Sequence, residues 1–307
     1  MIVKTLRLIL SGNQLQTLRT FRDVVSVRLA SAGSLFFGLF PDRLVLFLRT
    51  HMRVVRPLDY SEAKIVLDVE SRVEYGTRLH SCAKEPETID WIQTFFRPGD
   101  VYYDIGANVG AYALVAAKRF RGDVQVYAFE PSYPTFKQLC TNVVINDCQD
   151  CITPLQVALS DQTGIAVLNY SSLVPGSALH ALGEACDYKG DKFRPAVKQP
   201  VLAFALDDLI RQFALSPPAH IKLDVDGIEL SILRGAEKTL ASTVLRSVLV
   251  EILEGDAHSM EVVSFLERCG LTLHSKHKYI HGGSTGPSSR IYNYIFHRQG
   301  ASGVSVR

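Results

Sequence analysis

Two short stretches of the sequence carry residue types that can bind a ligand containing a nucleoside. In the first, an apolar run beginning at Val101 leads into a turn with glycines at Gly106 and Gly110. Glycine lets the backbone turn tightly and approach a ligand closely, and a helix that follows offers unpaired amides. The second is Glu130, which ends the next apolar run, twenty residues after Gly110. In a doubly wound sheet this carboxylate lies beside the turn and can accept hydrogen bonds from both hydroxyls of a ribose.

Two further residues indicate which nucleoside cofactor is bound. Asp104 stands directly before the turn, where it would repel a pyrophosphate and attract the ammonium or sulfonium group of S-adenosylmethionine. Asn108 replaces a glycine of the dinucleotide fingerprint. An adenine dinucleotide, and with it a nicotinamide-dependent oxidoreductase, is the alternative. Tyr188 and Lys192 have the spacing of a short-chain dehydrogenase pair, but Gly190 between them argues against one shared helix face.

Acidic side chains after two later strands are the candidate catalytic groups. Asp224 ends one predicted strand, Asp226 lies close by, and Glu251 is at the end of the next strand. Since ligands in open parallel sheets bind at the carboxyl ends of the strands, all three would lie at the mouth of the site. We predict that Asp224 is the base that takes a proton from the acceptor, the alternative being a helix cap. Three carboxylates could also hold Mg²⁺, but solvated carboxylates are common at strand ends, so no metal is assigned.

Two histidines are alternative bases. His277 and His281 lie in a predicted loop, residues 276–290, on the same edge of the sheet. Imidazole is the side chain with an ordinary pKa nearest neutrality, which suits proton transfer. Exposed loop histidines without a catalytic role are the competing interpretation.

These residues are positioned by predicted strands that alternate with helices. We predict strands at 63–69, 101–105, 124–129, 152–158, 165–169, 219–224, 247–252, 271–275 and 291–297, and helices at 86–96, 109–120, 133–146, 205–213, 228–241 and 259–269. Such alternation is typical of a parallel sheet covered on both faces, and the last two strands, with no helix between them, must pair antiparallel. The predicted fold class is α/β, a doubly wound Rossmann-like sheet of the class I methyltransferase type with an antiparallel last strand. Residues 171–200 are predicted to form an irregular loop.

Charge divides the chain unevenly. Residues 1–58 carry nine Lys and Arg against two Asp, a balance of +7, whereas the whole chain has a net charge of only +2. We predict four parts: a basic helical N-terminal segment at 1–58, a lead-in strand and helix that cover the cofactor pocket at 59–100, a catalytic domain at 101–298 and a tail at 299–307. A nucleic-acid partner is not expected, because it would need a concentrated basic face.

The apolar clusters at 35–40 and 44–48 allow two interpretations of the N-terminal segment. Phe and Leu flanked by Arg suit the interface of an anionic membrane. Packing on the catalytic domain, or a homodimer contact, would bury the same clusters in protein. No stretch reaches the roughly 18 apolar residues of a membrane span and no signal-peptide pattern is present, so we expect a cytoplasmic protein that is at most peripheral to the inner face of a membrane.

The order and spacing of several blocks resemble the FkbM-type methyltransferase family, from about Glu85 to the strand at 291–297. The blocks are Pro98–Asp100, Asp104–Gly110, Phe129–Pro131, Ala158–Asp161 with Gly164, Leu206–Leu209, Ile221–Glu229 and Leu233–Ala236. One departure is Asp226, where the family usually has Glu. The resemblance implies transfer of a methyl group from S-adenosylmethionine to oxygen, often a hydroxyl of a sugar, a glycolipid or a secondary metabolite.

The resemblance also implies roles for individual residues. Asp104, Gly106, Asn108 and Gly110 would hold the methionine moiety, Glu130 the ribose and Asp161 the adenine amino group, with Glu85 helping to close the pocket. Besides the oxidoreductase, a cofactor-binding module without catalysis is an alternative. The acidic residues at 224, 226 and 251 count against it.

Overall fold

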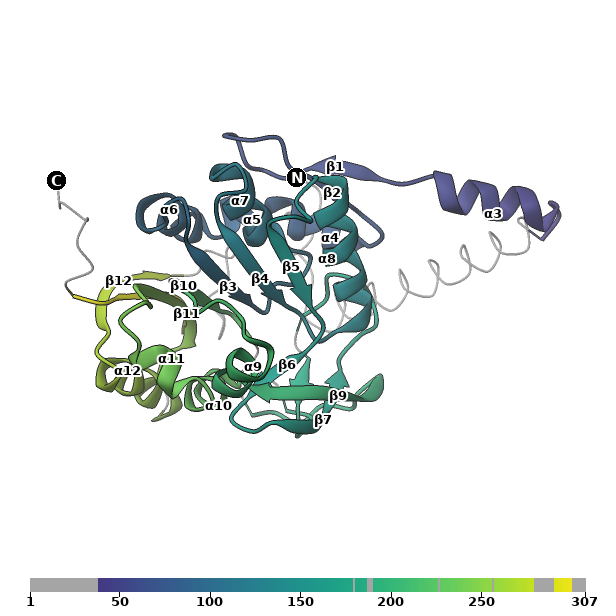
Figure 1. Ribbon diagram of the computed structural model, residues 1–307. Helices are drawn as coiled ribbons and strands as arrows, with labels where there is room; N and C mark the ends of the chain where they lie inside the picture. The colour runs from purple at the N-terminus through teal and green to yellow at the C-terminus, as the bar shows by residue number, and fades with distance from the viewer. Residues whose placement is uncertain are drawn as a thin grey trace, which may run out of the picture. The chain divides into compact units, whose positions relative to one another are not determined.

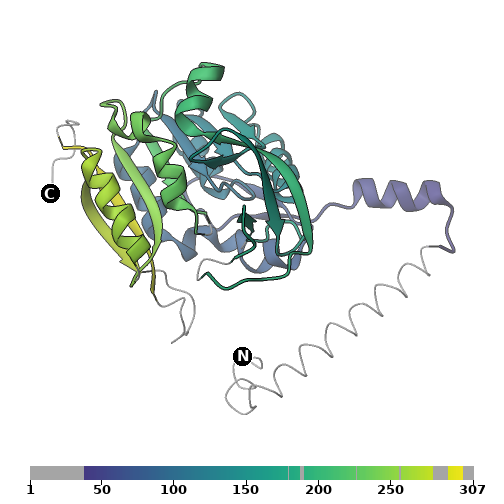
Figure 2. The same ribbon diagram turned by 90° about the horizontal axis from the view of Figure 1, so that it is seen from below.

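The computed structural model describes residues 38–178, 180–186, 190–225, 227–255, 257–278 and 290–299. The chain divides into two units, residues 1–53 and residues 54–307. The larger unit contains a seven-stranded sheet with helices on both faces, a four-stranded sheet and a two-stranded sheet (Figures 1 and 2). The functional site therefore has to be sought in the larger unit.

The seven-stranded sheet has the order β12-β13-β11-β10-β3-β4-β5. Its strands are β3 (Val101–Ile105), β4 (Gln125–Phe129), β5 (Ile152–Leu155), β10 (His220–Leu223), β11 (Ser247–Leu253), β12 (Thr272–Lys278) and β13 (Ile291–His297). The strands from β5 to β11 pair in parallel, whereas β13 pairs antiparallel with both β11 and β12. The predicted fold class, a doubly wound Rossmann-like sheet with an antiparallel last strand, is confirmed.

Helices cover each face of this sheet because both faces of its central strands are apolar, as parallel sheets require. One face carries α6 (Pro86–Phe95), α7 (Ala111–Arg119) and α8 (Tyr133–Ile145), and the other α9 (Leu206–Phe213), α10 (Glu229–Arg234), α11 (Glu237–Ala241) and α12 (Ala257–Arg268). Trp91 and Leu114 belong to the core of the first face, and Leu233 and Leu266 to that of the second. The two cores hold the strand ends in fixed positions.

The region before the sheet contains short elements. They are β1 (Val55–Pro57), β2 (Val66–Asp68), α4 (Arg72–Gly76), a 3₁₀ helix η1 (Arg78–His80) and α5 (Ser81–Lys84). β1 pairs antiparallel with β2, so the last residues of the predicted helical segment 1–58 form a strand instead. Ser71 and Glu74 form a capping box that fixes the start of α4.

The predicted loop at 171–200 is wrong at its end. A second sheet, in the order β6-β9-β7-β8, is built from β6 (Ala158–Ser160), β7 (Gly164–Tyr170), β8 (Ala181–Leu182) and β9 (Val197–Ala205). The sequence did not predict β9 because the strand contains Pro200. Proline is rare inside strands, since it cannot donate a ladder hydrogen bond. β6 pairs only with residues from Ala203 onward, so Pro200 lies where β9 has a neighbour on one side alone.

Other elements also differ from the prediction. The strand predicted at 152–158 ends at Leu155, and Ala158 already belongs to β6 of the second sheet. The helix predicted at 228–241 is split into α10 and α11 at Gly235, where a Cβ atom would lie 2.1 Å from the carbonyl oxygen of Ser160. His277 belongs to β12, not to a loop, while His281 lies outside the described residues.

The smaller unit contributes one described helix, α3 (Asp42–His51). None of its residues is buried, and Leu46 and Phe47 are 59% and 56% exposed. In the part of the chain that the structure describes, no helix is long and apolar enough to cross a membrane. The membrane-surface and homodimer interpretations of residues 1–58 both stay predictions.

A buried polar network joins α6 to the amino-terminal edge of the sheet. Ser247 Oγ accepts a hydrogen bond from Trp91 Nε1 at 2.9 Å and lies 2.7 Å from His220 Nδ1. His220 Nε2 lies 3.0 Å from Asp100 Oδ2. The ring is fully buried, and burial lowers the pKa of His220 to about 4 although Asp100 opposes that shift. His220 is therefore neutral in the folded protein at neutral pH.

This network predicts a loss of stability in mild acid. In the unfolded chain a histidine takes up its proton near pH 6.5, whereas folded His220 does so only near its pKa of about 4. Unfolding is therefore favoured as the pH falls through this window, by about 2 kcal/mol at pH 5. Urea unfolding at pH 7 and pH 5 should show this loss in the wild type and a smaller one in His220→Gln. Equal losses in both proteins would contradict the assignment to His220.

Candidate functional site

The glycine turn between β3 and α7 passes directly against the end of β10. Gly106 has φ +83°, and a Cβ atom there would lie 2.0 Å from the carbonyl oxygen of Asp224. Gly110 has φ +85°, and its Cβ would meet Leu139 of α8 at 2.5 Å. Only glycine fits either position, since the backbone is left-handed and the space is occupied. Gly106 thus brings the turn to the candidate base, and Gly110 lets α8 pack against the start of α7.

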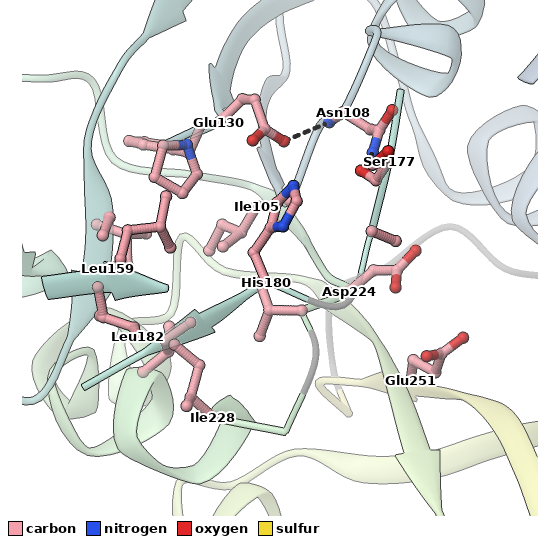
Figure 3. Close-up of a pocket in the computed structure, with 18 of the residues that line it drawn as sticks. Ile105, Asn108, Glu130, Leu159, Ser177, His180, Leu182, Asp224, Ile228 and Glu251 are labelled. Atoms are coloured by element: carbon pink, nitrogen blue, oxygen red, sulfur yellow. Dashed lines mark hydrogen bonds between the residues drawn. The ribbon is translucent and has the colours of Figure 1, made fainter. Parts of the chain in front are cut away.

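Glu130 is joined to the turn by hydrogen bonds. Its Oε2 accepts from the backbone amide of Asn108 at 3.0 Å, drawn as the dashed line in Figure 3, and its Oε1 accepts from the amide of Ser132 at 2.9 Å. Glu130 is only 7% exposed. The predicted neighbourhood of the turn and this carboxylate is present in the structure.

A cavity of about 240 Å³ opens at the carboxyl ends of the parallel strands, beside the turn (Figure 3). Apolar side chains line much of it: Ile105, Phe129, Pro131, Val157, Leu159, Leu168, Leu182, Val225, Ile228 and Ile232. Polar and charged side chains also line it: Arg78, Lys84, Asn108, Glu130, His180, Asp224 and Glu251. A pocket that combines an apolar lining with a few converging polar groups is the usual form of a cofactor site.

The charged side chains come from one face of the sheet. Successive residues of a strand point to opposite faces, and Lys222 of β10 is the register partner of Asp104 on β3. Lys222, only 1% exposed, has its Nζ 2.5 Å from Asp224 Oδ2 and 3.9 Å from Glu85 Oε2. Burial alone would lower the pKa of Lys222, but Asp224, Glu85 and Asp104 together raise it above its usual value. Lys222 is therefore a buried cation held by carboxylates.

Three acidic groups near the turn, Asp224, Glu251 and Asp104, differ in how readily they ionise. Burial opposes ionisation of Asp224, but Lys222 outweighs it and the pKa of Asp224 is lowered. Burial, followed by the charge of Asp224, raises the pKa of Glu251 well above its usual range. Burial likewise raises the pKa of Asp104 to about 6, although Lys222 opposes this. Ionisation is therefore favoured at Asp224 and disfavoured at Glu251.

Most of the predicted site residues come together. Gly106, Asn108, Glu130, Asp224 and Glu251 line the cavity, and Glu85 lines a narrower one beside it. Asp104 and Gly110 belong to the framework of the turn and line neither cavity, as far as the described residues show.

Other predicted residues lie elsewhere. Asp161 is exposed, and its backbone amide donates to Ser231 Oγ at 3.2 Å, so the structure does not bring its side chain to the cavity lining. His277 contacts Ser275 through Nε2 and is likewise not among the lining residues described. Asp226, and Tyr188 of the dehydrogenase-like pair, lie outside the described residues.

The polar lining does not include a recognisable metal site. Among the residues with a described position, no group of three or more His, Cys, Asp and Glu side chains is arranged to hold a metal ion.

Ser177, Ala178 and His180, from the predicted irregular loop at 171–200, line the cavity. The carbonyl oxygen of Ser177 accepts from Asn108 Nδ2 at 3.1 Å, and that of Gly176 accepts from Arg78 Nε at 2.9 Å. His180 follows and points into the cavity (Figure 3). Burial lowers the pKa of His180 to about 4, with a contribution from the charge of Arg78. Arg78, Ser177 and His180 gave no signal in the sequence, because they lie in no periodic pattern or motif.

Comparison with known proteins gives similarities to methyltransferases. The family model described as the methyltransferase FkbM domain matches residues 104–272. The chain is 28% identical over 190 residues to methyltransferase sdnD of Sordaria araneosa, covering 55% of this chain and 73% of that protein. It is 28% identical over 197 residues to the 31-O-demethyl-FK506 methyltransferase FkbM of Streptomyces tacrolimicus, covering 58% and 74%.

Two further similarities are weaker. The hexuronic acid methyltransferase AglP of Haloferax volcanii is 25% identical over 183 residues, covering 60% of this chain and 68% of that protein. Among solved structures, M. jannaschii TYW2 in complex with AdoMet has a TM-score of 0.41 and 12% identity, over 80% of this chain and 86% of that one.

Proposed function

Because the chain belongs to the FkbM methyltransferase family, we propose that it transfers the methyl group of S-adenosylmethionine to a hydroxyl oxygen of a sugar, a glycolipid or a secondary metabolite. The observation that carries this proposal is the meeting of the glycine turn, Glu130 and Asp224 around one cavity. A ribose-binding carboxylate and an ionised carboxylate at the same strand edge are what such a transfer needs.

The cavity fits an adenosine-containing cofactor. The carboxylate of Glu130 accepts from the amides of Asn108 and Ser132, and carboxylate oxygens also accept hydrogen bonds from hydroxyls such as those of a ribose. The apolar lining around Val157 and Leu159 offers a surface for an adenine ring. S-adenosylmethionine supplies, when bound, a methyl group that is already activated on a sulfonium.

Asp224 is the residue that we assign to proton removal. Lys222 bonds its Oδ2 and keeps it ionised, which leaves Oδ1 for the hydroxyl of an acceptor. A carboxylate with a lowered pKa is a weak base for a free hydroxyl. The hydroxyl proton becomes strongly acidic as its oxygen gains a bond to carbon, so a weak but well-placed base is sufficient.

The proposed class of methyl acceptor is based on the names of the relatives. One is named for 31-O-demethyl-FK506 and another for hexuronic acid. A hydroxyl acceptor is consistent with both names, and the charged lining of the cavity near Asp224 and Glu251 is consistent with a polar acceptor.

Glu130→Ala tests the cofactor assignment. We expect wild-type protein to bind S-adenosylhomocysteine, and the variant to bind it more weakly by about 1–3 kcal/mol, the cost of leaving buried hydrogen-bonding groups unpaired. Isothermal titration calorimetry measures both affinities.

The exposed Asp150→Ala serves as the matched control and should keep the wild-type affinity. A parallel titration with NAD separates the oxidoreductase alternative. Binding of NAD in preference to S-adenosylhomocysteine would overturn the proposed function.

A further inference from the structure

A second, narrower cavity adjoins the first on the side of α7. It measures about 30 Å³, room for about two water molecules. It shares Arg78, Lys84, Gly106, Asn108 and Asp224 with the larger cavity. Its remaining lining comes from the first residues of α7, from α5 and from β10: Ser81, Glu85, Ala107, Val109, Ala111, Tyr112 and Lys222. The narrow cavity is thus an extension of the candidate cofactor site.

Charges of both signs line this extension. Its three cations are Arg78, Lys84 and Lys222, and its two carboxylates are Glu85 and Asp224. Lys222 lies 2.5 Å from Asp224, and Lys84 lies 2.9 Å from Glu85. Each carboxylate therefore has a lysine partner, and Arg78 is the cation of this cavity that belongs to neither pair.

Arg78 is held in place by one side of its guanidinium group. Its Nε donates to the carbonyl oxygen of Gly176 at 2.9 Å, which fixes the plane of the group. Its terminal nitrogens have no hydrogen-bond partner among the residues that the structure describes. The positive charge of Arg78 acts on two groups that line the larger cavity, since it lowers the pKa of both Asp224 and His180. An anchored guanidinium group with free donors is suited to binding a carboxylate.

The other walls favour a zwitterion. Val109 and Ala111 place the start of α7 beside Arg78, where the helix dipole adds positive potential. Glu85 supplies negative charge on the side of Lys222. An amino acid group, with one carboxylate and one ammonium, matches both signs.

We propose that Arg78 binds the carboxylate of the cofactor's amino acid tail, with this carboxylate in the narrow cavity and the rest of the tail in the larger one. The inference rests on the proposed function, because it takes S-adenosylmethionine as the ligand. It adds a cation to the residues expected to hold the methionine moiety, which are otherwise acidic or uncharged.

The test compares two ligands that differ by one carboxylate. S-adenosylhomocysteine and its decarboxylated analogue share the adenosine and the ammonium group, and only the first can bind Arg78 as proposed. Arg78→Met should weaken S-adenosylhomocysteine roughly 10- to 100-fold in calorimetric titration, the range for a lost charge-assisted hydrogen bond. The same variant should bind the decarboxylated analogue within about twofold of the wild type.

Two further variants keep the comparison interpretable. Arg72→Met, an exposed arginine on the neighbouring helix α4 that lines neither cavity, should leave both affinities unchanged. Arg78→Lys keeps the positive charge but lacks the paired donors of the guanidinium group. It should lose less affinity for S-adenosylhomocysteine than Arg78→Met does, and none for the decarboxylated analogue. Thermal unfolding followed by circular dichroism establishes that each variant is folded.

Each contrary outcome has a distinct meaning. If Arg78→Met weakens both ligands equally, Arg78 only holds the backbone near Gly176 and the inference is wrong. If it weakens neither, the carboxylate is bound elsewhere and the inference is again wrong. If the wild type binds no S-adenosylhomocysteine, the proposed function fails as well.

Discussion

Lys222→Met is expected to lower the free energy of unfolding by about 3–5 kcal/mol, the usual cost of removing one partner from a buried ion pair. Lys222 is 1% exposed and lies between Asp224 and Glu85, with its Nζ 4.9 Å from the centroid of the Tyr112 ring. Methionine has a similar length and shape, so the packing is largely kept and the charge is lost. Asp224 then loses its lysine partner, and Glu85 keeps only Lys84.

Urea unfolding at pH 7 and pH 5 measures this effect. Loss of the cation leaves burial to raise the pKa of Asp224 in the folded variant above its unfolded value, so the folded state takes up a proton first as the pH falls. The deficit of Lys222→Met should therefore shrink at pH 5. The exposed Lys64→Met is the matched control, with an expected change within about 0.5 kcal/mol. A variant as stable as this control would show that Lys222 has no such role.

Asp224→Asn is expected to lower turnover by about 10²-fold or more, the usual scale for loss of a positioned general base. Asparagine has nearly the same shape and can still accept a hydrogen bond from Lys222, but it cannot take up the hydroxyl proton. Affinity for S-adenosylhomocysteine should remain close to that of the wild type, because the ribose is assigned to Glu130.

The rate is measured as transfer of a radiolabelled methyl group, using whichever hydroxyl acceptor from a panel of sugars, uronic acids and glycolipids gives the highest wild-type rate. Asp150→Asn, at an exposed residue that lines neither cavity, should retain that rate. Glu251→Gln is the informative comparison. Burial raises the pKa of Glu251, so a neutral amide is a closer substitute there than at Asp224. A larger loss in Glu251→Gln than in Asp224→Asn would transfer the role of base to Glu251.

The frame of the site was predictable from the sequence because its signals are local. Strand β3, the glycines at 106 and 110, and Glu130 at the end of the next strand follow one another within thirty residues. The rule that ligands meet the carboxyl ends of parallel strands then places Asp224 and Glu251 beside them. Short apolar runs alternate along the chain with segments of helical periodicity. This alternation was sufficient to predict the strands and helices of the sheet, since each element buries its own apolar residues.

The residues that complete the site were decided by tertiary contacts. Arg78 meets Gly176 across 98 positions of the sequence, and Asn108 meets Ser177 across 69, and neither contact leaves a periodic pattern in the chain. His180 belongs to the same segment as Gly176 and Ser177. Strand β9 was not predicted because it contains Pro200, which is tolerated where the strand has a neighbour on one side alone.

The sequence by itself determined which ionisable groups stand at the strand ends, because position in a strand follows from a local pattern. It did not determine their protonation. Asp224 and Glu251 are both carboxylates near the same strand edge, yet the pKa of the first is lowered by Lys222 and that of the second is raised by burial. Only the tertiary structure decides this difference, because the free energy of a charge depends on the solvent excluded around it and on which opposite charge the fold places within a few ångströms.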